Sequence, residues 1–86
     1  MESSGPSEVV QIDRSVRKYW RVKVPKKMAE GAVEAVIELG GERWVVPIDR
    51  YGRVYVPSQL RENIGKHKSI TLRREGKKVV LRPRPF

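Results

Sequence analysis

One short pattern occurs twice in this chain, and it constrains the fold more than any other feature. Val9–Arg14 and Val45–Arg50 agree at five of six positions, at an offset of 36 residues. Arg21–Pro25 and Arg53–Pro57 agree at four of five positions, at an offset of 32, because the first copy has four more residues between its two motifs. A unit of about 36 residues is too small to close a hydrophobic core alone. We therefore expect two copies to complete one core.

The alternation of β-branched residues within each copy predicts a mainly β fold. Val22 and Val24 alternate with polar residues, as do Val54 and Val56, and a proline ends each run. A short helix is expected after each proline, and in the second copy Ser58 is expected to cap a helix over residues 59–64. Residues 32–39 fit a helix face or a strand, and the glycine pair that follows them favours a strand and a hairpin.

These signals divide the chain into four segments. Residues 1–8 are expected to form a disordered tail, and residues 84–86 a second tail. Residues 9–44 are the first, degenerate half-barrel unit, and residues 45–83 are the second unit.

The charge balance indicates an anionic partner. The chain carries 19 Lys and Arg against 10 Asp and Glu, a net charge of +9, and residues 48–86 hold eleven of the basic side chains but three acids. Such a surplus in 86 residues is typical of proteins that bind nucleic acid or an acidic surface.

The same composition speaks against several other classes. There is no Cys and one His, no long apolar run and no nucleotide-binding loop, so we expect no metal, no cofactor and no enzymatic activity. We expect a cytoplasmic, nucleoid-associated protein without a membrane segment.

The second copy resembles the AbrB/SpoVT/MazE family of swapped-hairpin β-barrels. The residues that carry the resemblance are Ile48–Pro57, then Leu60–Glu62, Ile64 and Gly65, then Ile70, Leu72 and Val79–Pro83. The resemblance implies an AbrB-like barrel built from two interlocked units, with a short helix after each Val-Pro strand end. It also implies a prokaryotic DNA-binding transcriptional regulator, as a homodimer or, in the MraZ-like arrangement, as two units in one chain.

In DNA-binding members of that family, an arginine after the turn glycine and an arginine in the short helix contact DNA. The matching positions here are Arg53 and Arg61, whereas Ala29 stands at the second position in the first copy. Basic residues of both turns and of the strand that follows complete the set that we expect to contact double-stranded DNA. That set is Arg14, Arg17, Lys18, Arg21, Lys23, Arg50, Arg53 and Arg61. Trp20, beside the first turn, fits packing and partner contact equally well.

Three alternatives remain open from the sequence. A general chromatin-type DNA binder is a close variant of the regulator. An antitoxin-like module would instead dock a basic protein partner on the acidic stretch from Glu30 to Glu42. A membrane-surface role would need an amphipathic basic helix, which the sequence does not show.

Overall fold

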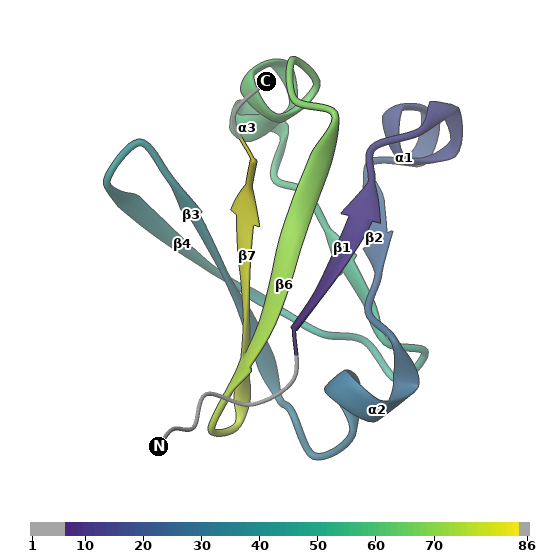
Figure 1. Cartoon of the computed structure of the whole chain (residues 1–86), viewed down its shortest axis with the longest axis vertical. Helices are drawn as coiled ribbons and strands as arrows, with labels where there is room; N and C mark the ends of the chain where they lie inside the picture. Colours follow the sequence, from purple (N-terminus) through teal and green to yellow (C-terminus); the bar gives the residue numbers. More distant parts are fainter. Residues whose placement is uncertain (1–6, 85–86) are drawn as a thin grey trace.

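Seven strands and three short helices make up residues 7–84, the part of the chain that the computed structural model describes (Figure 1). The expectation of a mainly β fold is confirmed. In chain order the elements are β1 (Ser7–Gln11), α1 (Arg14–Tyr19), β2 (Arg21–Lys23), α2 (Lys26–Ala29), β3 (Glu34–Leu39), β4 (Glu42–Pro47), β5 (Arg53–Tyr55), α3 (Ser58–Ile64), β6 (Ser69–Glu75) and β7 (Lys78–Pro83).

The strands form two sheets. Five of them make a mixed sheet in the order β1-β6-β7-β3-β4, in which β3 and β7 run parallel and the other neighbours run antiparallel. The remaining two, β2 and β5, pair with each other as an antiparallel ribbon. Within residues 7–84 these sheets do not form a single closed barrel, so the confirmed part of the expected fold is its β class.

The core lies between the ribbon and the larger sheet. Val22 and Val54, at the centres of the two ribbon strands, have no exposed surface. They pack in one cluster with inward-facing residues of the larger sheet such as Leu72 and Leu81. Burying a valine or leucine side chain contributes about 1.5–3 kcal/mol, so this cluster supplies most of the force that joins the two sheets.

The two copies of the sequence repeat meet in the ribbon. Val22 pairs with Val54, its counterpart at the offset of 32. Arg21 pairs with Tyr55, the counterpart of Lys23, and Lys23 pairs with Arg53, the counterpart of Arg21. Outside the strands, the amide of Val24 donates to the carbonyl of Gly52 at 2.7 Å, and the amide of Val56 donates to the carbonyl of Trp20 at 2.8 Å. Val56 and Trp20 are the counterparts of Val24 and Gly52, so the two hydrogen bonds are equivalent. An approximate twofold axis therefore passes through the ribbon.

Within the segment from 32 to 39, residues 34–39 form a strand rather than a helix, as the glycine pair had favoured. Leu39 pairs with Glu42 across a two-residue turn in which Gly40 and Gly41 both have positive φ, of 59° and 83°. This is the backbone of a tight β-hairpin turn, and its twist matches that of the strands. The spacing of the glutamates at four residues therefore reflects a strand with Glu34 and Glu38 on one face.

Two local expectations were wrong. Residues 14–19 form helix α1, where the sequence had suggested an irregular turn; the carboxylate of Asp13 caps it by accepting from the amide of Val16 at 2.9 Å. Helix α3 begins at Ser58 itself, with Pro57 at the N-cap position and no side-chain capping bond. Pro57 has an extended backbone, with ψ of 145°, so the helix begins at the next residue.

The ends of the described chain are also better ordered than expected. Ser7 and Glu8, placed in the tail by the sequence, pair with β6. Arg82 and Pro83 also pair with β6 as the end of β7, and the amide of Arg84 donates to the carbonyl of Ser69 at 2.9 Å. Residues 1–6 and 85–86 of the expected tails lie outside the described residues.

Candidate nucleic-acid interface

The outer face of the β2–β5 ribbon is basic. Side chains alternate along a strand, so Val22 and Val54 point into the core and their neighbours point outward. Those neighbours are Arg21 opposite Tyr55 and Lys23 opposite Arg53. Opposite positions lie about 5 Å apart, and the two pairs lie about 7 Å apart along the strands. Three cations and one phenol therefore share a small surface, part of which is hollowed between β1, α1 and the ribbon.

A tyrosine ring supports an arginine at each end of this face. The guanidinium carbon of Arg21 lies 4.7 Å from the centre of the Tyr19 ring, and that of Arg53 lies 4.9 Å from the centre of the Tyr51 ring. A guanidinium over an aromatic face is held there by the ring quadrupole. Both arginines are half-buried, and both tyrosines are exposed. Each stack limits the directions in which its arginine can point.

A second cation flanks each ring. The ammonium of Lys18 lies 5.4 Å from the centre of the Tyr19 ring, and the guanidinium carbon of Arg50 lies 5.8 Å from that of Tyr51. Lys18 and Arg50 are counterparts at the offset of 32, as the two tyrosines are. The ribbon thus carries the same cation–tyrosine–arginine group twice. Because the strands are antiparallel, the two groups lie at opposite ends.

The turn before β5 is fixed by Asp49. Its carboxylate oxygen accepts from the amide of Arg53 at 2.8 Å and from the amide of Tyr51 at 2.9 Å. These bonds, the amide of Arg53 first, hold the pKa of Asp49 below its ordinary value of 3.8. Gly52 closes the turn with φ of 78°, in the left-handed region that favours glycine. The carboxylate therefore orients the backbone that presents Arg53.

The matching turn of the first copy is built differently. Here Asp13 caps a six-residue helix, and Trp20 stands where the second copy has Gly52. Trp20 adopts the same left-handed backbone, with φ of 51°. A bulky residue in this conformation costs about 1 kcal/mol, which the packing of the half-buried indole must offset. This assigns Trp20 a packing role.

The eight residues predicted from the sequence fall into three groups. Arg21, Lys23 and Arg53 lie on the outer ribbon face, and Lys18 and Arg50 flank it. Lys23 also donates to the carbonyl of Tyr51 at 2.6 Å, which ties the end of β2 to the second turn.

The other three lie apart from that face or are held by the backbone. Arg14 is exposed at the start of α1. Arg61, on α3, donates through Nε to the carbonyl of Val56 at 3.1 Å. Arg17 donates to the carbonyls of Ile12 at 2.7 Å, His67 at 3.2 Å and Gly65 at 3.4 Å. Its guanidinium thus joins α1 to the C-terminal end of α3.

Sequence reasoning left Tyr19 and Tyr51 out of the site. The signal was available, because the match at the offset of 32 extends backward beyond Arg21 and Arg53. It includes the two tyrosines and, one residue earlier, a basic residue in each copy. The full repeated motif is therefore a basic residue, Tyr, a turn residue and Arg-Val-x-Val-Pro.

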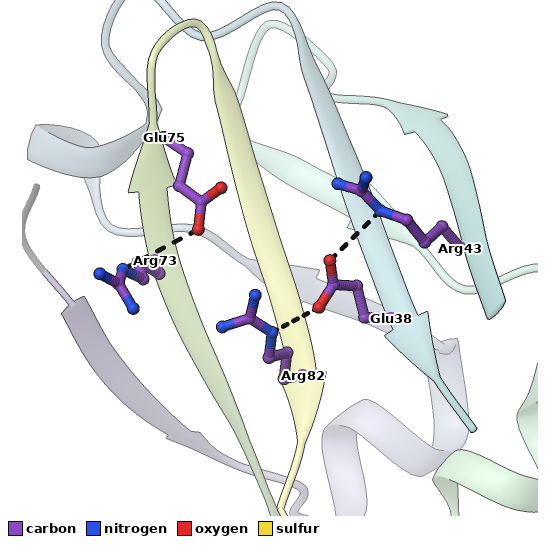
Figure 2. Close-up of polar contacts among 5 residues, drawn as sticks. All are labelled: Glu38, Arg43, Arg73, Glu75 and Arg82. Atoms are coloured by element: carbon purple, nitrogen blue, oxygen red, sulfur yellow. Dashed lines mark hydrogen bonds and ion pairs between the residues drawn. The ribbon is translucent and has the colours of Figure 1, made fainter. Parts of the chain in front are cut away.

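In the acidic stretch, Glu38 is paired with two arginines. Figure 2 shows Glu38 on β3 between Arg82 and Arg43, with an Nε–Oε2 distance of 3.2 Å to Arg43, while Glu75 lies 3.9 Å from Arg73 on β6. The hydrogen bond from Arg82 lowers the pKa of Glu38, and the same bond raises the pKa of Arg82. The outer face of the larger sheet therefore carries paired charges of both signs.

Comparisons with other proteins and searches for other kinds of site add no further assignment. No family model matches the chain, and neither the curated proteins nor the solved structures gave a significant match. In residues 7–84, no group of three or more His, Cys, Asp or Glu side chains is placed to hold a metal ion. No helix in that range is both long and apolar enough to cross a membrane.

Proposed function

We propose that this protein binds double-stranded DNA through the outer face of the β2–β5 ribbon and acts as a transcriptional regulator. The observation that carries the proposal is the pair of tyrosine-supported arginines, Arg21 and Arg53, related by the approximate twofold axis of the ribbon. The major groove of B-form DNA admits a two-stranded β-ribbon, and arginine forks match the acceptor pair of guanine.

The cations on and around this face suit different parts of the DNA. Arg21 and Arg53 are the candidates for base contacts, since they lie on the ribbon and their rings restrict them. Lys18 and Arg50 lie beyond the rings and suit phosphates, which a mobile point charge or a fork can both neutralise. Lys23, opposite Arg53 and two residues beyond Arg21 on β2, adds a further positive charge.

We also propose that the fold is a single-chain version of the swapped-hairpin arrangement. Both ribbon strands come from one chain, and their register follows the sequence repeat. One chain then supplies the two symmetric arms that a homodimer of single units would otherwise supply. Light scattering should give the mass of one chain, whereas a mass of two chains would favour the homodimer.

Fluorescence anisotropy with duplex DNA over a salt series tests the DNA proposal. If the five cations named above all meet phosphate or base, the slope of log K against log salt is negative, with a magnitude of at most about 4.5. Lys18→Ala should flatten the slope by about 0.9. Arg53→Ala should cost about 1–3 kcal/mol on a preferred sequence.

Arg43→Ala is the matched control, because it removes the same charge from the outer face of the larger sheet, where Arg43 pairs with Glu38. Equal losses in Arg43→Ala and Arg53→Ala would show that the ribbon is not the binding face. No binding at low salt would refute the DNA proposal. Selection from a random duplex pool separates the alternatives, since a regulator enriches one sequence and a chromatin-type binder does not.

A further inference from the structure

A surface groove lies beside the second turn of the ribbon. It has a volume of about 620 Å³ and runs between α2 and the loop that leads into β5, which lie together at one end of the ribbon (Figure 1). Its apolar lining includes Ala29, Ala32, Val33, Ile48 and Tyr51. Val33 is 63% exposed and Tyr51 is 56% exposed, so the groove accounts for two of the large apolar side chains left open to solvent in the described chain.

The approximate twofold axis gives this groove a counterpart at the other end of the ribbon, between α1 and α3. The counterpart is filled by the chain itself. The Trp20 indole lies so close to Gly65 that a Cβ added there would be 3.1 Å from the indole Cη2. Arg17 also reaches this end of the ribbon and donates to the carbonyls of Gly65 and His67.

Three differences between the copies explain why the space between α1 and α3 is filled while the groove beside α2 is open. Gly52 stands where Trp20 supplies an indole, and Ala29 stands where Arg61 supplies a long side chain. Val33 stands at the offset of 32 from Gly65 and is left uncovered. The backbone corresponds at Gly52 and Trp20, as the paired hydrogen bonds of Val24 and Val56 show, although helix α1 precedes Trp20 and a turn precedes Gly52. The groove therefore lies at the position that the Trp20 indole fills in the first copy.

We propose that this groove is a binding site for a small, uncharged, planar aromatic molecule of the size of indole. The shape follows from the counterpart occupant, and the volume lies in the range of ligand pockets. The charges at the rim are mixed, with Lys23, Lys26 and Arg50 against Glu30 and Asp49. Asp49 already accepts two backbone hydrogen bonds, and Lys23 donates to the carbonyl of Tyr51. Apolar contact with a ring, rather than a net charge, therefore selects the ligand.

Titration of the ¹⁵N-labelled protein with indole, followed by amide chemical shifts and without DNA, tests the site. Saturable shifts are expected at Ala29, Val33, Tyr51 and Gly52. Gly52→Trp should abolish them, because it installs the residue that fills the counterpart; Trp20 also has a left-handed φ, and a Cβ at Gly52 would lie 3.3 Å from the carbonyl oxygen of Val24. Gly40→Trp is the matched control, since Gly40 also has positive φ, of 59°, and a Cβ there meets nothing within 4 Å.

A second variant and a second probe keep the test decisive. If Gly52→Trp does not fold, Ala29→Arg fills the groove from α2 with the side chain that Arg61 supplies in the other copy. Either folded variant should weaken indole binding by about tenfold or more, and Gly40→Trp should leave it unchanged. Unsaturable shifts, or equal binding by a filled variant, would overturn the proposal. Binding of N-acetyltryptophanamide without binding of indole would also overturn it, because the site would then be one for a peptide side chain.

Discussion

Removal of the Tyr51 ring tests whether the ribbon presents its arginines in a fixed direction. The guanidinium carbon of Arg53 lies 4.9 Å from the ring centre, and the tyrosine is 56% exposed. An exposed cation–π contact contributes about 0.5–1 kcal/mol. If that energy holds Arg53 in the DNA-binding direction, Tyr51→Leu should weaken binding by about two- to fivefold.

The repeat supplies the comparison that makes this small effect measurable. Tyr19→Leu should give a loss of the same size, because the Arg21 guanidinium carbon lies 4.7 Å from that ring. The double variant should lose about five- to thirtyfold if the two stacks act independently. Anisotropy titrations at one fixed salt concentration, with folding checked by circular dichroism, measure all three.

Phenylalanine separates the ring from the hydroxyl. Tyr51→Phe keeps the aromatic face and should bind DNA as the parent protein does. If Tyr51→Phe loses as much as Tyr51→Leu, the hydroxyl contacts DNA and the stacking argument is wrong. If neither variant changes the affinity, the ring does not restrict Arg53 in the complex.

Two further outcomes follow from the hydrogen bonds of the turns. Arg17→Ala should lower the free energy of unfolding by about 1–3 kcal/mol, measured with urea, because three backbone carbonyls lose their donor. Arg17→Lys should not restore it, because an ammonium cannot span the carbonyls of Ile12, Gly65 and His67 as a fork does. Asp49 should titrate below 3.8 in an NMR experiment, and the stability that it contributes should be complete above that pH and be lost as the pH falls toward the lowered pKa. Asp49→Asn should reduce this loss of stability at low pH. If the variant loses stability at low pH as the parent protein does, Asp49 does not stabilise the turn in the way assigned to it.

The parts of this fold that the sequence predicted are those with local causes. The period-two runs around Val22 and Val54, the stop at each proline and the hairpin at Gly40 all depend on residues within a few positions. The pairing of the two copies was also predictable, because a repeat too short to close its own core must pair with something.

The parts that it did not predict depend on contacts between distant segments. Helix α1 has six residues, fewer than an isolated helix needs, and the arginine that joins it to α3 bonds carbonyls about 50 residues away. The parallel pairing of β3 with β7 is likewise remote in sequence. Arg17 was assigned to DNA because its residue type suits that role, and no pattern near it indicates the carbonyls of Gly65 and His67.

The arginines show why net charge alone overstates the binding surface. Arg17 and Arg74 perform the same task at the two ends of the ribbon: Arg17 bonds carbonyls after α3, and Arg74 bonds the carbonyls of Met28 and Glu30 at the end of α2. Helix ends leave carbonyls without intrahelical donors, and a guanidinium can satisfy several at once.

The ion pairs compensate further positive charge on the larger sheet, away from the face that DNA would meet. Arg43 and Arg82 share Glu38 on the opposite sheet, so their charges are partly compensated by their own partner. The cations that remain with the ribbon are Arg21 and Arg53, one toward each end, together with Lys23. The number of ions released on binding should therefore follow the ribbon and its two flanks, and not the net charge of +9.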